Sequence, residues 1–280
     1  MSQPYPILAP SGAAPDAASG LCALGVMIKA PRAGASKTRL VPPLTHEEAA
    51  ELSVQFLRDT AANIAEACAR SGGRSRGVAV YTPVGAEGAF DGLLAPGFSL
   101  LPQRGEGFGE RLFNAADDLL RAGFDSLCLR DSDSPTLPTR ALVAAVEELS
   151  KPSDRCVLGP ADDGGYYLIG LKRARRALFE EIDWSTERVA RQTVERAEAA
   201  GLDVALLPAW YDVDDAPTLR RLCEELFGVN APGACDFGVE GYAAPHTRAH
   251  LARLIEREGR ARIWPEVNAG DSPASAEAAP

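Results

Sequence analysis

The stretch LCLRDSDSPTLP, residues 127–138, joins an apolar strand to a charged loop. The apolar run ends at Leu129, and Asp131 and Asp133 follow it one residue apart, just before Pro135. Paired carboxylates at this point either cap the next helix, where Asp and an early Pro are favoured, or hold Mg²⁺ or Mn²⁺. The position favours the metal, because ligands of open α/β sheets bind at the carboxyl ends of strands.

Apolar runs and helical repeats alternate along the chain on both sides of this stretch. Strands are predicted over residues 21–29, 77–83, 98–103, 125–130, 155–160, 165–171 and 203–208. Helices are predicted over residues 45–68, 107–123, 138–150, 185–201 and 245–259, and at the end of 209–226. The first helix begins with a capping box formed by Thr45 and Glu48. This alternation predicts a three-layer α/β/α fold with a mostly parallel sheet.

The composition limits the partners and the compartment. The 280 residues are 46% hydrophobic, which is enough for one large α/β domain with appendages. The formal net charge of −10 argues against nucleic acid or an anionic membrane as the main partner. The six cysteines form no C-x-x-C pair, and no apolar run is long enough to span a bilayer. We therefore expect a cytoplasmic protein with free thiols.

Four segments are expected along the chain. Residues 1–20 and 265–280 are rich in Ala, Pro, Ser and Gly, which predicts a disordered leader and a disordered tail. Residues 21–228 form the predicted main α/β domain, and residues 229–264 form a predicted C-terminal helical extension. The sequence leaves a homodimer open.

Four unusual stretches follow predicted strands and are expected on one edge of the sheet. They are residues 29–39, 130–135, 160–165 and 211–215. The carboxyl ends of parallel strands meet at one edge, so their coincidence predicts a single ligand site there.

The first of these stretches is a basic loop. It carries Lys29, Arg32, Lys37 and Arg39, and Gly34 lets the backbone approach a ligand closely. The four cations can neutralise phosphate oxygens. The loop lacks the P-loop pattern G-x-x-x-x-G-K-[ST], and an ordinary solvated loop is the alternative.

The segment GPADDGGYYLIGL predicts a turn beside the ligand. Asp163 precedes Gly164 and Gly165, and an Asp-Gly pair between two apolar runs is a strong hairpin signal. Glycine also permits close approach to a ligand, so we expect the turn to line the pocket. Trp184 and Ser185, in the segment DWST, are candidates for contact with an acceptor.

A second acidic stretch, WYDVDD, precedes a helix. Asp214 and Asp212 are candidate second metal ligands, with helix capping as the alternative. Asp215 is assigned to capping because Pro217 follows within the first turn. The predicted edge contains no histidine and the chain lacks G-x-S-x-G, which argues against a Ser-His-Asp hydrolase.

Taken together, these motifs carry a family likeness. IKAPRAGASKTRL, GEGFGERL, DSDSPTLP, GPADDGGYYLIGL, DWST and WYDVDD occur in this order within residues 25–226. The set resembles a bacterial family of uncharacterised glycosyltransferase-like proteins that is linked by genome context to arsenosugar or selenium-related pathways. The resemblance implies a GT-A fold, that of the nucleotide-diphospho-sugar transferases.

The layout is more distantly similar to the phospholactate and molybdenum-cofactor guanylyltransferases. That likeness implies that Lys29, Lys37 and Arg39 bind phosphate and that Asp133 and Asp214 bind metal. Two positions depart from the pattern. Ala30–Pro31 replaces the Gly-Gly of pyrophosphorylase loops, and Arg130 adds a charge beside Asp131. Whether Asp131 binds metal or pairs with Arg130 stays open.

The expected activity is transfer from an activated nucleotide with Mg²⁺ or Mn²⁺. Lys37 and Asp133 would act in the chemistry, while Asp163 with Gly164–Gly165 would shape the acceptor side. The first candidate is glycosyl transfer from a nucleotide-sugar to a small-molecule acceptor. The alternative is nucleotidyl transfer from a nucleoside triphosphate to a phosphorylated small molecule, favoured by the lysines of the first loop. A nucleotide-binding scaffold without catalysis is a distant third.

Overall fold

A seven-stranded sheet organises the structure, a computed structural model that describes residues 5–10, 18–228 and 240–264. Its strands are β1 Cys22–Lys29, β2 Ser75–Thr82, β3 Ser99–Pro102, β4 Ser126–Arg130, β5 Arg155–Pro160, β6 Tyr166–Leu171 and β7 Asp203–Leu206. The spatial order is β3-β2-β1-β4-β6-β5-β7. All neighbours pair in parallel except β6, which runs antiparallel to β4 and β5. The predicted mostly parallel sheet is confirmed.

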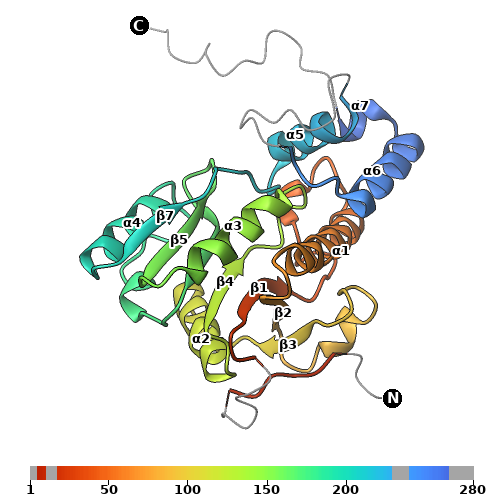
Figure 1. Cartoon of the computed structure of the whole chain (residues 1–280). Coiled ribbons are helices and arrows are strands. Elements are labelled where there is room, and N and C mark those ends of the chain that lie inside the picture. Colours follow the sequence, from red (N-terminus) through yellow and green to blue (C-terminus); the bar gives the residue numbers. More distant parts are fainter. Residues whose placement is uncertain (1–4, 11–17, 229–239, 265–280) are drawn as a thin grey trace, which may run out of the picture.

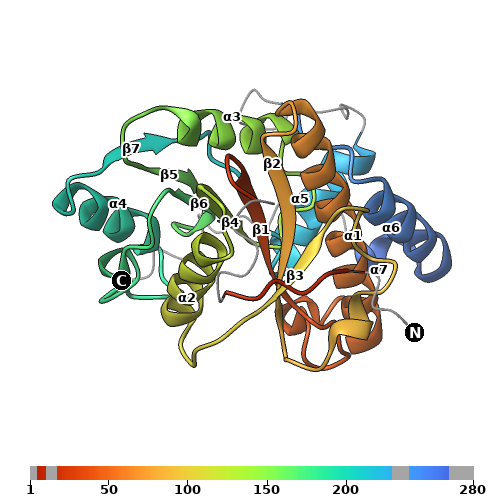
Figure 2. The same ribbon diagram turned by 60° about the horizontal axis from the view of Figure 1, so that its bottom comes forward.

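Helices cover both faces of the sheet (Figures 1 and 2). They are α1 His46–Arg70, α2 Phe108–Arg121, α3 Thr139–Ser150, α4 Val189–Ala199, α5 Ala216–Phe227, α6 Pro245–Glu258 and α7 Arg260–Ile263, with 3₁₀ turns η1 Thr38–Leu40, η2 Glu87–Phe90 and η3 Arg176–Leu178. Buried side chains of α1, α3, α5 and α6 share one core, and those of α2 and α4 share the other. The three-layer prediction is therefore correct. None of the helices that the structure describes is both long enough and apolar enough to cross a bilayer.

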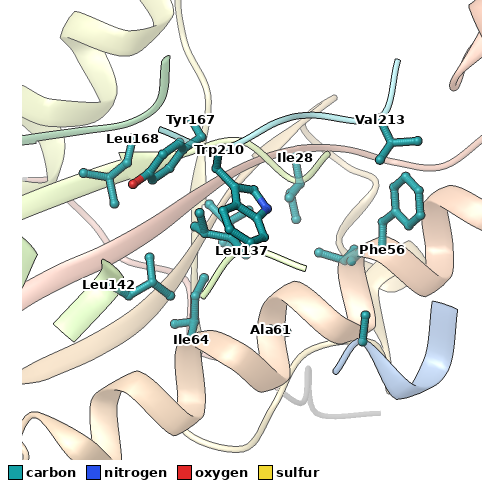
Figure 3. Close-up of a cluster of buried hydrophobic side chains, with 14 of the residues drawn as sticks. Ile28, Phe56, Ala61, Ile64, Leu137, Leu142, Tyr167, Leu168, Trp210 and Val213 are labelled. Carbon is teal, nitrogen blue, oxygen red and sulfur yellow. The ribbon is translucent and has the colours of Figure 1, made fainter. Parts of the chain in front are cut away.

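The core between the sheet and α1 fixes the positions of two charged residues, Lys29 and Asp214 (Figure 3). Ile28 is the residue before Lys29, and Val213 is the residue before Asp214; both are buried there, close to Phe56 of α1. Burying a side chain of this kind stabilises the fold by about 1.5–3 kcal/mol. Lys29, at the end of β1, and Asp214, in the segment before α5, are thus each anchored by a buried apolar neighbour.

The start of the chain differs from the expected disordered leader. The Tyr5 hydroxyl is buried and donates to the Leu94 carbonyl at 2.8 Å. Leu8 donates to Leu100 O, and Leu100 donates to Pro6 O, both at 2.8 Å. These contacts form because β3 is an edge strand whose free backbone groups can pair with a short extended segment. Residues 11–17 of the leader and the tail 265–280 lie outside the described residues.

The C-terminal helices α6 and α7 pack against α1. Both oxygens of the buried Asp59 carboxylate, on α1, accept backbone N–H groups from the first turn of α6: His246 N at 3.0 Å and Thr247 N at 2.7 Å. Leu251 and Leu254 enter the same core as α1. A carboxylate at a helix N-terminus satisfies donors that have no partner within the helix. The predicted helix over 245–259 is confirmed, while residues 229–239 of the extension lie outside the described residues.

Candidate active site

Lys37 lies where three distant segments of the chain converge. Its ammonium Nζ is 2.9 Å from Asp133 Oδ1 and 2.8 Å from Asp214 Oδ1, and it donates to the Val213 carbonyl at 2.8 Å. The side chain is only 7% exposed. Its backbone is left-handed, with φ 50° and ψ 41°, which costs a non-glycine residue on the order of 1–3 kcal/mol. The three contacts hold Lys37 in this conformation.

Charge is unevenly balanced around this ammonium. Burial alone would lower the pKa of Lys37, but the carboxylates of Asp133 and Asp214 outweigh it and raise the pKa above its ordinary value. Lys37 is therefore a fixed cation shared by two anions. Arg39 lies farther away and is 69% exposed, with Nη1 3.6 Å from Asp214 Oδ2 and Nη2 3.7 Å from Asp215 Oδ2.

The neighbouring Asp131 shapes the loop that carries Asp133. Its Oδ1 accepts the backbone N–H groups of Asp133 at 3.0 Å and Ser134 at 3.1 Å, and its Oδ2 accepts the Ser134 hydroxyl at 3.1 Å. Arg130, 3% exposed, donates through Nε to Asp131 O and through Nη2 to Ser134 O, both at 2.9 Å. Arg130 Nη2 also lies 3.6 Å from Asp131 Oδ1, so Asp131 is paired with Arg130 in this structure, while Asp133 faces Lys37.

Two adjoining cavities open on this cluster. The first, of about 380 Å³, is lined by residues that include Lys29, Lys37, Arg39, Thr82, Gln103 and Arg111. The second, of about 530 Å³, is lined by residues that include Asp131, Asp163, Gly165, Tyr166, Trp184, Ser185 and Asp212. Both are lined by Met27, Arg39, Phe108, Ser132, Asp133 and Asp214, so the cluster stands at their junction.

The hairpin between β5 and β6 forms one wall of the second cavity. Asp163 Oδ1 accepts the Gly165 N–H at 2.8 Å. Gly164 has φ +90°, and a Cβ there would come within 2.2 Å of the Glu187 carbonyl oxygen. Only glycine fits this position, because both the backbone angle and the space exclude a side chain.

An aromatic group forms another wall. The Trp184 ring packs edge-on against Phe108, with centroids 5.0 Å apart, and against Tyr166 at 6.4 Å. Ser185 has φ +63°, so the chain cannot enter a helix there, and α4 begins at Val189 instead of the predicted residue 185. The predicted contact residues Trp184 and Ser185 therefore lie in an irregular loop that lines the second cavity.

Asp212, a carboxyl group that lines the second cavity, has a raised pKa. Burial, together with repulsion from Asp214, Asp163 and Asp131, raises its pKa to about 7. Near neutral pH the protein can therefore hold a proton on Asp212. The aspartates that line the second cavity therefore carry more negative charge than the neighbouring cations neutralise.

The carboxylates of Asp133 and Asp214 fit a divalent cation whose remaining ligands come from the substrate. Within the described ranges, no three or more His, Cys, Asp or Glu side chains group as an all-protein metal site. Asp133 and Asp214 nevertheless converge on one cation, the Lys37 ammonium. Mg²⁺ in nucleotide enzymes is typically bound by one or two carboxylates plus substrate phosphates. The residues present fit that arrangement.

The structure brings together most of the residues singled out in the sequence. Lys29, Lys37, Arg39, Asp133 and Asp214 line the first cavity, and Asp131, Asp163, Gly165 and Asp212 line the second. Arg32 lines neither cavity. Gly164 packs against the Glu187 backbone and lines neither cavity. Asp215 caps α5 by accepting the Thr218 N–H at 3.0 Å. Thr82, Gln103, Phe108 and Arg111 were missed, although Thr82 and Gln103 stand at the ends of β2 and β3, on the predicted edge.

Comparison with solved structures shows the fold. A protein from Desulfovibrio desulfuricans G20, provisionally named a nucleotide-diphospho-sugar transferase, is 28% identical, with a TM-score of 0.71 over 87% of this chain and 98% of its own. A cytidylyltransferase from Leptospira borgpetersenii serovar Hardjo-bovis is 12% identical, with a TM-score of 0.46 over 89% and 99%. Rv0371c from Mycobacterium tuberculosis H37Rv is 19% identical, with a TM-score of 0.44 over 74% and 100%. The first match confirms the predicted nucleotide-diphospho-sugar transferase fold.

Sequence comparison bears out the family likeness for the middle of the chain. No curated protein sequence matches the chain. Residues 63–186, which include β2 to β6 and the DSDSPTLP and ADDGG motifs, match the sequence model of a family described as "Uncharacterized protein conserved in bacteria (DUF2064)". The resemblance to an uncharacterised bacterial family is thereby confirmed, and it is DUF2064 that this central segment matches.

Proposed function

We propose that this protein is a metal-dependent glycosyltransferase that uses a nucleotide-sugar donor and a small-molecule acceptor. The observation that carries the proposal is the cluster of Lys37, Asp133 and Asp214 at the junction of two cavities. The shared fold and 28% identity with the Desulfovibrio protein, whose provisional name is nucleotide-diphospho-sugar transferase, support it. In the described part of this chain, five cysteines are free, which suits the reducing cytoplasm where nucleotide-sugars occur.

The first cavity would bind the donor nucleotide. Asp133 and Asp214 would hold Mg²⁺ or Mn²⁺, which when bound neutralises charge on the diphosphate. Lys29, Lys37 and Arg39 would contact phosphate oxygens. Their charge would stabilise the negative charge that grows on the diphosphate as it leaves, and a cation held in place as firmly as Lys37 would contribute about 10²–10³ in rate.

The second cavity would bind the sugar and the acceptor. An acceptor hydroxyl attacks the anomeric carbon, the carbon–oxygen bond to the diphosphate breaks, and the nucleoside diphosphate leaves with the electron pair. The hydroxyl proton passes to a carboxylate, and we assign this role to Asp163. Its carboxylate lines the cavity, and the Gly165 N–H holds it in place at 2.8 Å.

One observation favours nucleotidyl transfer as a second candidate. The cations that line the first cavity, Lys29, Lys37, Arg39 and Arg111, could meet the extra charge of a triphosphate. In that reaction an acceptor phosphate oxygen attacks the α-phosphorus, and pyrophosphate leaves.

A thermal-shift panel separates these candidates. Each common nucleotide-sugar and each nucleoside triphosphate is added with and without Mg²⁺ or Mn²⁺, to the wild type and to Asp133→Ala. A ligand at a hundred times its Kd stabilises the native state by about 2.7 kcal/mol, enough to detect. We expect a metal-dependent shift with one nucleotide-sugar that is lost in the variant.

Other results would change the assignment. A metal-dependent shift with a triphosphate alone would favour nucleotidyl transfer. Binding without turnover of any acceptor would leave a nucleotide-binding scaffold. No shift with any of these ligands would contradict the proposal, and Asp133 and Asp214 would then only balance the charge of Lys37.

A further inference from the structure

Gln103 stands directly after β3 and lines the first cavity. Its amide nitrogen Nε2 donates to two backbone carbonyls, Ile28 O on β1 at 3.1 Å and Val80 O on β2 at 2.8 Å. Because both partners are acceptors, only the NH₂ end of the amide can face them. The orientation of this side chain is thus determined by chemistry.

The other end of the amide is left as an acceptor. Among the described residues, no donor forms a hydrogen bond with Gln103 Oε1. This oxygen is also absent from the buried polar atoms that lack a partner, so it remains accessible to solvent. The backbone N–H of Gln103 is itself bound to Tyr81 O at 2.8 Å, so the residue is held at both ends. Gln103, which lines the cavity, therefore has a fixed amide whose carbonyl oxygen can still accept a hydrogen bond.

The sheet sets the distance from this oxygen to the charged cluster. β3 and β4 are separated by β2 and β1, and neighbouring strands lie about 4.8 Å apart, so the two strand ends are about 14 Å apart. Lys37 is bound to Asp133, just beyond β4, which places the phosphate-binding end there. The span suits a nucleotide that lies across the strand ends, with its base at Gln103.

We infer that Gln103 selects the nucleobase and requires a ring N–H. This inference rests on the proposed function, because it assumes that the first cavity binds a nucleotide. Guanine offers N1–H and uracil offers N3–H to Oε1. Adenine and cytosine present a lone pair at the corresponding ring nitrogen. Nε2 is tied to Ile28 and Val80, so the amide cannot turn to donate to that lone pair.

Calorimetric titration of the wild type with nucleoside diphosphates and Mn²⁺ tests the inference. GDP, UDP, ADP and CDP are compared with N1-methyl-GDP and N3-methyl-UDP, in which the ring N–H is replaced. We expect GDP or UDP to bind at least about tenfold more tightly than ADP and CDP. We expect methylation of the preferred base to weaken binding at least about tenfold. The tighter of GDP and UDP identifies the base.

A variant shows whether Gln103 is the cause. Gln103→Met keeps the length of the side chain and removes the acceptor. In it, the base preference and the effect of methylation should both fall below about threefold. Gln192→Met is the matched control, since Gln192 lies on α4 outside both cavities and its amide donates to Asp183 at 2.8 Å. The control should keep the wild-type preference.

The possible failures are distinguishable. Equal binding of ADP or CDP by the wild type, or a methylation effect that persists in Gln103→Met, would overturn the role of Gln103 and leave the nucleotide site standing. Circular dichroism shows whether Gln103→Met folds. If it does not, titration of the wild type with the methylated nucleotides still tests whether the ring N–H is required. If no nucleoside diphosphate binds, the proposed function fails together with this inference.

Discussion

Two charged clusters in this protein use similar side chains but differ in charge balance. One joins α1 to α6 and α7: the Glu48 carboxylate lies 3.3 Å from Arg257 Nη2 and 3.2 Å from Arg262 Nη1. Glu258 bridges the same guanidiniums, at 2.7 Å from Arg257 Nε and 2.8 Å from Arg262 Nη1. Two anions thus meet two cations. Such a cluster is electrically complete and ties helices together.

The cluster around Lys37 is not complete in this sense. One ammonium is shared by Asp133 and Asp214, and the exposed Arg39 lies 3.6 Å from Asp214 while also approaching Asp215. One negative charge remains at the junction of the two cavities. Excess charge of one sign in a cleft attracts a ligand of the other sign. We therefore expect the unbalanced cluster to bind a ligand and the balanced one not to, whatever the number of ion pairs in each.

Removing a carboxylate from the unbalanced cluster should have the largest effect. Asp133→Asn keeps the shape of the side chain but leaves Asp214 as the one anion facing Lys37. We expect metal-dependent nucleotide binding and turnover to fall at least about 100-fold, because the metal loses a charged ligand. Calorimetric titration with Mn²⁺ and the preferred nucleotide measures the loss of binding.

The matched control for this change is Asp163→Asn in the second cavity. It should bind nucleotide within about threefold of the wild type while losing turnover, because Asp163 is proposed to act on the acceptor. Wild-type metal-dependent binding by Asp133→Asn would mean that its carboxylate does not hold the metal.

Removing the shared cation, Lys37, should have a smaller effect. It should weaken nucleotide binding but strengthen the binding of metal alone. In Lys37→Met the two aspartates face each other without an ammonium between them, so we expect Mn²⁺ alone to raise the melting temperature more than in the wild type. Nucleotide affinity should fall about tenfold because a phosphate contact is lost. Differential scanning fluorimetry and calorimetric titration measure the two effects.

Arg39→Met provides the comparison for Lys37→Met. Arg39 is 69% exposed and its ion pairs are longer than 3.5 Å, so nucleotide affinity should change by about threefold or less. An unchanged nucleotide affinity in Lys37→Met would show that Lys37 only neutralises the aspartates.

The fold could be predicted from the sequence because its strands are strongly apolar. Every predicted strand is present in the sheet. The details that were not predicted have local causes. The segment from Tyr5 to Leu8 has no strand pattern of its own and is placed by the open edge of β3. The start of α4 was predicted too early, because nothing in the sequence reveals the left-handed backbone of Ser185.

The site could be predicted only as a set of residues on one edge. Lys37, Asp133 and Asp214 were identified because they follow strands that end together. That Lys37 lies between the two aspartates depends on contacts across as many as 177 residues, which no local pattern contains. Gln103 was missed since it is uncharged, and its role depends on carbonyls of two other strands.

Changing the balanced cluster should have the smallest effect and should act on stability alone. Burial would raise the pKa of Glu48, but Arg262, the Thr45 N–H and Arg257 outweigh it and lower the pKa below its ordinary value of 4.5. A lowered folded-state pKa stabilises the protein at neutral pH, and this contribution is lost as the pH falls through that pKa. Glu48→Gln should therefore lower the free energy of unfolding at pH 7 by about 1–2 kcal/mol.

The pH dependence of this loss separates charge from shape. Glutamine can still accept the Thr45 N–H, so the capping box survives and only the ion pairs to Arg257 and Arg262 are removed. Urea unfolding at pH 7 and at pH 4 should show the difference between wild type and Glu48→Gln shrinking at the lower pH, with nucleotide affinity unchanged. An equal difference at both pH values would mean that packing, and not the ionised carboxylate, joins α1 to α6 and α7. A change in nucleotide affinity would mean that the two clusters are coupled through α1. It would contradict the view that the balanced cluster acts on stability and the unbalanced one on ligand binding.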